Sequence, residues 1–376
     1  MSSIERIEVF NIGVPLEKPF VISLGTIDKL EEIIVRILDN EGNVGWGESS
    51  PSKRTLGTSL DGILAALDQV SPPLIGYDPR RIGEAVDLMD SYISGNTSAK
   101  AAIDIAIHDL VGNIRGEPVW RMLGGLCSER VETSYSIGMA SAEEMLAEAQ
   151  GAVSQGFRCL KVKVGLNPRQ DVRTIQQFRE ALGEGVKLTI DANQGWTRQE
   201  AVWALTQMAP FEIEFVEQPV LAYDIEGMAW VRSRSSIPVM ADESVHSPQD
   251  ALRVIQEKAV DYINIKLMKS GGLLRAKRVA AIAEAGCVPC MIGAESETNL
   301  SITAATHFAL ATKNVFLGDL GIAAKKETWF VTCGGSHIDQ GNHVLYDLYS
   351  PGLGIQDVKE DWLGTPIRVY GGAKSG

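Results

Sequence analysis

The fold is decided by residues 159–191, which read CLKVKVGLNPRQDVRTIQQFREALGEGVKLTID. One apolar run ends at Lys163, a segment of helical length follows, and a second apolar run ends at Asp191. Short apolar runs of this kind favour buried parallel strands, and the segment between them favours the helix that connects two such strands. The stretch is therefore predicted to be one strand–helix–strand step of an α/β fold.

The same step repeats through the middle of the chain. Amphipathic segments such as residues 142–155 and 248–258 separate most of the strand candidates, and Ser247 and Pro248 mark the start of the second helix. Eight strand candidates predict a parallel (β/α) barrel rather than a doubly wound sheet, which usually has a glycine-rich turn after its first strand. The candidates are residues 131–137, 159–164, 187–191, 213–217, 238–242, 262–267, 288–292 and 315–320.

The first third of the chain has a different pattern. Residues 4–10 and 33–38 are strand candidates, residues 39–43 have the composition of a hairpin turn, and helical spacing begins near residue 60. Strands followed by separate helices predict an α+β unit. We expect this domain at residues 1–125, the barrel at residues 126–354, and a tail at residues 355–376 that packs back on the first domain.

Composition limits the partners and the compartment. Of 376 residues, 45% are hydrophobic and 22% charged, which is typical of a globular chain. The net charge of −13 disfavours nucleic acid and anionic lipid as partners, and no apolar stretch is long enough to span a membrane. Five cysteines are an odd number in a long chain, which favours a reducing, cytoplasmic location. Cys287 and Cys290 are expected to be buried thiols.

Charged side chains end five successive strand candidates. One position per repeat places them on one rim of the barrel, at the C-terminal strand ends, where barrel enzymes carry their active sites. Because buried charges are rare unless paired or metal-bound, a ring of structural ion pairs is the alternative to a catalytic cluster. The residues are Lys161, Lys163, Asp191, Glu217, Asp242 and Lys266.

The types of these side chains point to a reaction. Asp191, Glu217 and Asp242 on neighbouring strands would repel one another without a cation, and oxygen ligands favour Mg²⁺ or Mn²⁺ over zinc. Lysines lie before and after the trio, so in a closed barrel they fall on opposite sides of the metal. A nearby cation would lower the pKa of such a lysine toward that of a useful base. The expected chemistry is removal of the proton α to a carboxylate, with the enediolate stabilised by the metal.

Five motifs carry a resemblance that covers nearly the whole chain. They are Lys161-Val-Lys163, Asp191-Ala-Asn193, Glu217-Gln-Pro219, Asp242-Glu-Ser244, and Ile265-Lys266 followed by Ser270-Gly-Gly272. Together they resemble the enolase superfamily, in its muconate-lactonizing-enzyme subgroup, and most of all the dipeptide epimerases.

The resemblance implies an assignment for each motif. It implies a modified (β/α)8-type TIM barrel with an N-terminal α+β capping domain, whose loops near residues 19–28 and 48–60 close over the site. It further implies a Mg²⁺-dependent isomerase in a symmetric homo-oligomer, acting on a small carboxylate. The implied metal ligands are Asp191, Glu217 and Asp242, and the implied acid/base groups are Lys163 and Lys266, assisted by Lys161.

The chain departs from the dipeptide epimerases at the eighth strand candidate. The resemblance implies an Asp-x-Asp pair on this strand, which in the dipeptide epimerases binds the ammonium group of the substrate. The matching stretch of this chain reads Asp319-Leu-Gly321, so the second aspartate is replaced by glycine. The first capping loop reads Leu24-Gly25-Thr26, without the arginine that family members acting on acidic dipeptides tend to have. The candidate substrate contacts are Asp319, Glu295, Glu297, Arg54 and Asn193.

Three readings of the function remain open. The first is an epimerase or racemase of a dipeptide or other N-substituted amino acid, which uses a lysine on each face of the substrate. The second is a muconate-type cycloisomerase, or a lyase like o-succinylbenzoate synthase, on the same site. The third is a catalytically silent barrel that binds a ligand, which the complete set of metal and lysine positions disfavours.

Overall fold

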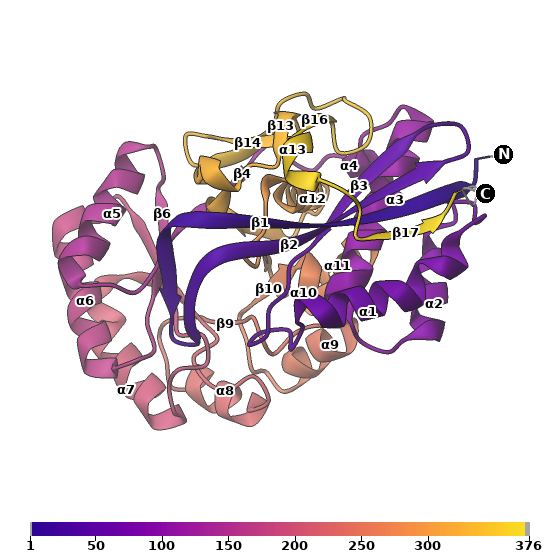
Figure 1. The fold of residues 1–376 in the computed structure, drawn as a ribbon. Helices are drawn as coiled ribbons and strands as arrows, with labels where there is room; N and C mark the ends of the chain where they lie inside the picture. Colours follow the sequence, from indigo (N-terminus) through magenta and orange to yellow (C-terminus); the bar gives the residue numbers. More distant parts are fainter. Residues whose placement is uncertain (1, 373–376) are drawn as a thin grey trace.

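The computed structural model describes residues 2–372, except for the side chain of Lys18. Its first unit is a four-stranded antiparallel sheet in the order β17-β1-β2-β3, with helices against one face (Figure 1). Gly47 of β3 allows the close approach of α3, because a Cβ atom there would lie 2.0 Å from the carbonyl oxygen of Ala102. The elements are β1 (Ile4–Ile22), β2 (Gly25–Asp39), β3 (Val44–Ser49), α1 (Leu60–Val70), η1 (Pro72–Leu74), α2 (Ile82–Tyr92), α3 (Thr97–Arg115) and α4 (Val119–Met122).

The second unit is a barrel of eight parallel strands in the order β12-β11-β10-β9-β8-β7-β6-β5. A bridge between Thr133 and Gly318 brings the first and last strands together, so the barrel is nearly closed. This architecture confirms the predicted α/β barrel with an N-terminal α+β domain. The barrel strands are β5 (Ser134–Ile137), β6 (Cys159–Lys163), β7 (Lys187–Asp191), β8 (Ile213–Glu217), β9 (Val239–Ala241), β10 (Tyr262–Lys266), β11 (Cys290–Gly293) and β12 (Val315–Asp319).

Two strand predictions differ from the structure. The predicted strand at residues 131–137 is split, since β4 (Val131–Glu132) leaves the barrel to pair with β15 (Asn342–Leu345). The predicted strand at residues 288–292 begins only at Cys290, because Pro289 has no amide hydrogen to donate to a neighbouring strand. The strand follows a turn in which Cys287 is left-handed (φ 56°). The same turn leaves the Cys287 thiol exposed, which corrects the expectation that it is buried; all five cysteines are free.

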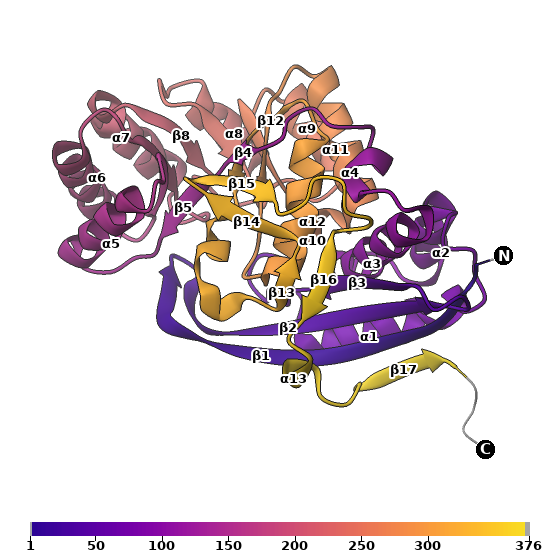
Figure 2. The ribbon, with the colours of Figure 1, turned by 90° about the horizontal axis from the view of Figure 1, so that it is seen from above.

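Helices connect the barrel strands and lie outside them (Figure 2). Ser247 caps α9 through a hydrogen bond from the Asp250 amide, as predicted, but the helix ends at Gln256 because Lys258 is left-handed (φ 53°). The helices are α5 (Ala142–Ser154), α6 (Pro168–Leu182), α7 (Arg198–Met208), η2 (Ala209–Phe211), α8 (Ile225–Arg232), α9 (Pro248–Gln256), α10 (Leu267–Ser270), α11 (Leu273–Ala285) and α12 (Asn299–Leu310).

The capping segment at residues 19–28 is a β-hairpin rather than the predicted loop. β1 continues to Ile22 and β2 begins at Gly25, so the two strands reach far beyond the predicted ranges and their tip lies over the barrel (Figure 1). Pro15 and Pro19 interrupt the strand pattern in the sequence. The structure accommodates both at a register shift between Pro15 and Phe20, where a missing amide hydrogen costs no ladder bond.

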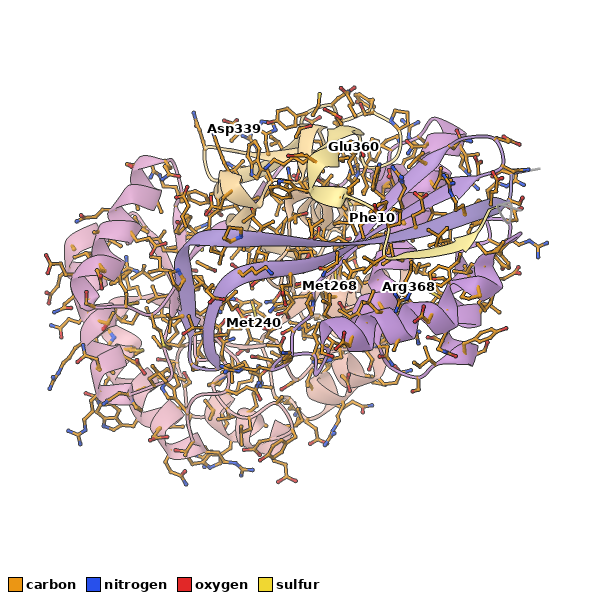
Figure 3. The ribbon with its side chains drawn as sticks, in the orientation of Figure 1. Phe10, Met240, Met268, Asp339, Glu360 and Arg368 are labelled. Atoms are coloured by element: carbon orange, nitrogen blue, oxygen red, sulfur yellow. The ribbon has the colours of Figure 1, made fainter. Side chains whose placement is uncertain are left out.

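The segment after the barrel returns to the first unit. β17 (Arg368–Gly371) begins at Arg368, which is labelled in Figure 3, and pairs antiparallel with β1. Arg368 forms an ion pair with Asp68 of α1. No helix within residues 2–372 is long and apolar enough to cross a bilayer. The remaining elements are η3 (Gly321–Ala324), η4 (Lys326–Thr328), β13 (Val331–Gly334), β14 (Ser336–Asp339), β15 (Asn342–Leu345), β16 (Ile355–Val358) and α13 (Glu360–Leu363).

Candidate active site

The strand ends bring the predicted charged residues into one buried cluster. Lys161, on β6, lies at its centre: its Nζ atom is 3.0 Å from Asp191, 2.8 Å from Glu217 and 2.7 Å from Asp319. These three carboxylates come from β7, β8 and β12, so one ammonium group joins strands from across the barrel. The lysine is 1% exposed, and only this density of negative charge can hold its ammonium group there.

Lys163 and Lys266 contact different carboxylates. The Nζ atom of Lys163 is 2.5 Å from Asp191 and 3.0 Å from the amide oxygen of Asn193. The Nζ atom of Lys266 is 2.8 Å from Asp242 and 3.4 Å from Glu295. The two lysines therefore approach the cluster through separate anchors, β7 for one and the segment after β9 for the other.

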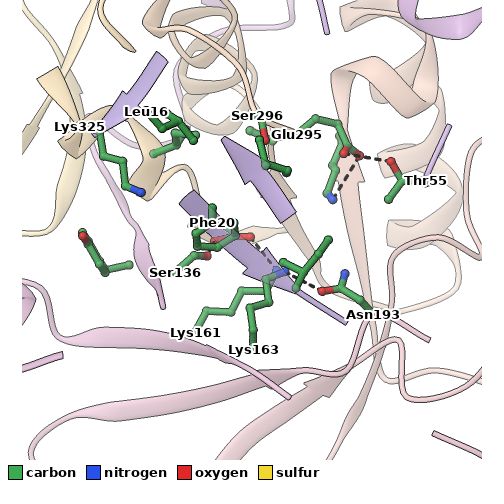
Figure 4. A pocket seen from close by; sticks show the side chains of 18 residues that line it. Leu16, Phe20, Thr55, Ser136, Lys161, Lys163, Asn193, Glu295, Ser296 and Lys325 are labelled. Carbon is green, nitrogen blue, oxygen red and sulfur yellow. Dashed lines mark hydrogen bonds and ion pairs between the residues drawn. The ribbon is translucent and has the colours of Figure 1, made fainter. Parts of the chain in front are cut away.

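Both lysines line one pocket between the barrel rim and the capping unit. Figure 4 shows Lys163 and Asn193 on one side of it, and Glu295 with Thr55 on another. The pocket has an empty volume of about 840 Å³, its open mouth included. Its apolar wall comes largely from the β1–β2 hairpin and η3. The apolar lining residues are Leu16, Phe20, Ile22, Ile27, Ala294 and Ile322.

The carboxylate trio fits a hard divalent cation. Asp191, Glu217 and Asp242 are completely buried oxygen donors, and Glu217 Oε2 accepts no hydrogen bond although Lys161 faces it. Among residues 2–372, no group of three or more Asp, Glu, His or Cys side chains already has a geometry that could hold a metal ion. Instead, an ammonium group lies within 3.0 Å of every carboxylate of the trio.

The same contacts set the pKa values. Burial, opposed by Lys161 and reinforced by Asp191, raises the pKa of Glu217 to about 7. Burial would also raise the pKa of Asp242, but Lys266 and Lys269 outweigh it and hold the pKa well below its usual range. For Lys266, burial acts to lower the pKa, yet Asp242 and Glu295 raise it well above the ordinary value.

The carboxylates around these lysines outweigh the effect of burial. Glu295, which follows β11, contributes a further negative charge 3.4 Å from Lys266. The pKa of Lys161 is raised for the same reason, because Asp191 and Asp319 overcome the effect of its burial. The lowered lysine pKa expected from the sequence refers to the site with a divalent cation bound, and it stays a prediction.

Sequence reasoning missed the groups that hold the carboxylates in place. Lys269, on the short helix α10, donates to both the side chain and the backbone carbonyl of Asp242, at 2.5 and 2.6 Å. Asn264 donates to Glu217 Oε1 at 2.8 Å, and the Gln218 side-chain oxygen accepts the amide hydrogen of Asp242 at 3.0 Å. The available signals were the three-residue spacing from Lys266 to Lys269 and the position of Asn264 two residues before Lys266.

The predicted substrate contacts separate into two groups. Asp319, Glu295 and Asn193 line the pocket. Glu297 is buried beneath it, where its carboxylate accepts the amide hydrogen of Glu295 at 2.8 Å. Arg54 is exposed and lines a neighbouring depression over Gly25 rather than the pocket that holds the lysines.

Two family models cover most of the chain. The "Mandelate racemase / muconate lactonizing enzyme, N-terminal domain" matches residues 5–124, and "Enolase C-terminal domain-like" matches residues 144–362. The second match alone spans more than half of the sequence, and its limits enclose every strand-end charge described above.

The chain is similar to epimerases and a racemase. It is 39% identical to the L-Ala-D/L-Glu epimerase of Clostridium acetobutylicum, over 94% of this chain and 99% of that one. A crystal structure of the dipeptide epimerase from Enterococcus faecalis, complexed with Mg and L-Leu-L-Tyr, has a TM-score of 0.91 at 38% identity and covers 94% and 100% of the two chains.

The crystal structure of N-succinyl Arg/Lys racemase from Bacillus cereus has a TM-score of 0.92 at 34% identity, over 98% of this chain and 99% of that one. Families of this breadth share the barrel, the capping unit and the polar strand ends, which are the features described above. The chain belongs to the enolase superfamily, in the group of mandelate racemase and muconate lactonizing enzymes, and it is an isomerase of that group.

Proposed function

We propose that this protein is a Mg²⁺-dependent epimerase or racemase of N-substituted amino acids, a class that includes dipeptides and N-acylamino acids. The observation that carries the proposal is the placement of Lys163 and Lys266 on separate anchors around one carboxylate cluster. Two bases on different sides of one α-carbon can remove a proton from one face and return it to the other. The similar epimerases and the racemase agree with this reaction class.

The residues divide the work as follows. Asp191, Glu217 and Asp242 would hold the divalent ion, which supplies positive charge where the enediolate develops. Oxygen donors suit Mg²⁺ and Mn²⁺ alike, and a relative crystallised with Mg supports Mg²⁺. Lys163 exchanges a proton with one face of the α-carbon and Lys266 with the opposite face. Lys161, bound to three carboxylates, orients the cluster and contributes fixed positive charge beside the substrate carboxylate.

The substrate lies between the rim and the hairpin in this proposal. Its carboxylate faces the lysines, and the rest of the molecule extends along the apolar wall formed by Phe20, Ile27 and Ile322. The hairpin covers the pocket, which keeps water from the carbanionic carbon and strengthens the electrostatic interactions there.

The test measures proton exchange at each face separately. Dipeptides and N-acylamino acids of both configurations are incubated with Mg²⁺ in D₂O, and α-proton exchange is followed by NMR. We expect Lys163→Ala and Lys266→Ala to abolish epimerisation, while each variant still exchanges the α-proton of one enantiomer, and a different one in the two cases. Exchange of neither configuration by the unaltered protein, across the whole set, would overturn the proposal.

A further inference from the structure

The pocket wall opposite Lys266 has its own charge pattern. Asp319, which the sequence offered as a contact for an ammonium group, already accepts three hydrogen bonds. Its Oδ1 atom accepts hydrogen bonds from Ser134 and Ser136, both at 2.9 Å, and its Oδ2 atom accepts one from Lys161 at 2.7 Å. Because a carboxylate with three donors has little capacity left, Asp319 is a poor partner for a charged amino group of the substrate.

The neighbouring position cannot supply a second carboxylate. A Cβ atom at Gly321 would lie 2.4 Å from the carbonyl oxygen of Ser134 and 3.1 Å from the Cα atom of Tyr135. Both atoms belong to the backbone of β5, so a side chain at residue 321 would fit only if that barrel strand moved. The absence of a side chain at Gly321 therefore allows η3 to pack closely on β5, and an aspartate cannot occupy this position.

A cation stands at the same end. Lys325 follows η3, lines the pocket, and is half-buried with its Nζ atom 5.3 Å from the centre of the Phe20 ring. Figure 4 shows it extending into the pocket from the side opposite Glu295 and Thr55. Among residues 2–372, no carboxylate lies within ion-pair distance of its ammonium group. A half-buried ammonium group without a carboxylate is open to an anion from outside the chain.

Resting on the proposed function, we propose that the substrate is an N-acylamino acid whose acyl group ends in a carboxylate, and that Lys325 binds that carboxylate. The α-carboxylate faces the metal ligands and the lysines of the rim. The acyl chain passes Phe20 and Ile322, whose apolar surfaces suit its methylene groups. Its terminal carboxylate then forms an ion pair with Lys325. No second carboxylate is present at residue 321 that could bind an ammonium group at this end of the pocket.

Charge along the pocket supports this order of groups. The lining cations are Lys161, Lys163, Lys266 and Lys325, whereas its lining carboxylates are Glu295 and Asp319, each already in contact with a lysine. A substrate with two carboxylates complements this surface, and one with a free ammonium group opposes it. A protein of net charge −13 repels a dicarboxylate, and a cation inside the pocket offsets this repulsion locally.

The experiment compares three acyl groups that differ at one terminus. N-succinyl, N-succinamoyl and N-β-alanyl derivatives carry a carboxylate, a neutral amide and an ammonium group, respectively, at the end of the same two-methylene spacer. Each is made on leucine, arginine and glutamate, and kcat/KM for α-proton exchange is measured with Mg²⁺ in D₂O. We expect the succinyl compounds to exceed the succinamoyl compounds by about 10- to 100-fold, and the β-alanyl compounds to be slowest.

Variants of Lys325 assign the preference to this residue. Lys325→Gln should remove the advantage of succinyl over succinamoyl, and Lys325→Glu should place β-alanyl above succinyl. Lys326→Gln is the matched control, since Lys326 is exposed and its Nζ atom lies 5.9 Å from Trp329. Lys326→Gln should leave kcat/KM for all three acyl groups within about threefold of the unaltered protein.

The outcomes separate the two proposals. Exchange of the β-alanyl compounds at or above the rate of the succinyl compounds would overturn the role of Lys325 while leaving the epimerase proposal intact. An unchanged succinyl preference in Lys325→Gln would do the same. Absence of exchange in all nine compounds, together with the broader set above, would overturn the epimerase proposal itself.

Discussion

The two walls of the pocket are built differently. On the barrel wall each charged group has several partners: Lys161 contacts three carboxylates, and Asp242 contacts Lys266 and Lys269. On the capping wall the polar contacts are few, such as that of Thr55 with Glu295 at 3.1 Å. A barrel wall that is fully cross-linked suits chemistry shared by a family, whereas a wall made of loops and a hairpin can change with the substrate. Disturbing the two walls should therefore have very different consequences.

The largest effect is expected for the proposed metal ligands of the barrel wall. Glu217→Gln removes the charge of the carboxylate whose Oε2 atom accepts no hydrogen bond. We expect calorimetry to show Mg²⁺ affinity reduced at least about 100-fold and exchange activity reduced about 1,000-fold, since a bound cation contributes several kcal/mol to stabilising the enediolate. Chelation by EDTA should abolish activity and Mg²⁺ should restore it.

Glu200→Gln is the control for this experiment. Glu200 is an exposed member of the capping box at the start of α7 and does not touch the cluster. If Glu217→Gln bound Mg²⁺ as tightly as the unaltered protein, Glu217 would not be a metal ligand, and the proposed difference between the two walls would be wrong.

Lys269 tests whether the barrel wall also stabilises the fold. Lys269→Met keeps a long side chain but leaves Asp242 with one ammonium partner and deprives two carbonyl oxygens of a donor. Breaking a buried ion pair on one side costs about 3–5 kcal/mol, so we expect the free energy of unfolding in urea to fall by about 3 kcal/mol. The exposed Lys313→Met should change it by less than about 0.5 kcal/mol. Equal effects of the two would show that Asp242 does not depend on Lys269.

The sequence predicted the barrel wall far better than the capping wall, and for a physical reason. A strand alternates its side chains and ends at a fixed place in each repeat, so Lys163, Asp191 and Glu217 could be placed together from spacing alone. The hairpin could not be predicted, because Pro15 and Pro19 interrupt its strand pattern, and the pairing resumes only after a register shift between Pro15 and Phe20.

Side chains that act through space were also out of reach. Lys325 lies in a 3₁₀ connection without a repeat, and its place in the pocket depends on how Gly321 packs on β5. Glu295 follows β11 closely enough to be a candidate, but its effect on the pKa of Lys266 depends on a distance that no spacing reveals. The charged residues of the barrel rim can thus be predicted from local sequence spacing, whereas the residues proposed to determine substrate specificity are placed by tertiary packing.

Glu297 lies where the two walls meet, and it predicts a pH dependence of stability. Burial, reinforced by the charge of Glu48 on β3, raises the pKa of Glu297 to about 8 from a value near 4.5 in the unfolded chain. The folded protein therefore binds a proton that the unfolded chain loses, so this contribution is full below pH 4.5 and disappears as the pH rises through 8.

Glu297→Gln should behave like the protonated residue. We expect it to unfold with about 1–3 kcal/mol more free energy than the unaltered protein at pH 9, and to differ little at pH 5. Urea unfolding across this range measures the difference, and taking the difference cancels the titration of other groups. The exposed Glu284→Gln should show no such trend. A constant difference from pH 5 to pH 9 would mean that Glu297 is ionised throughout.

The smallest effect is expected on the capping wall itself. Ser23, at the tip of the hairpin, donates to the carbonyl oxygens of Ala192 and Asn193, both at 3.1 Å, and so links the hairpin to the end of β7. A hydrogen bond of this kind contributes about 0.5–1.5 kcal/mol, so Ser23→Ala should raise KM about 2- to 10-fold and leave kcat within twofold. A loss in kcat as large as that of Lys163→Ala would show that hairpin closure takes part in the proton transfer, and that the two walls act as one unit.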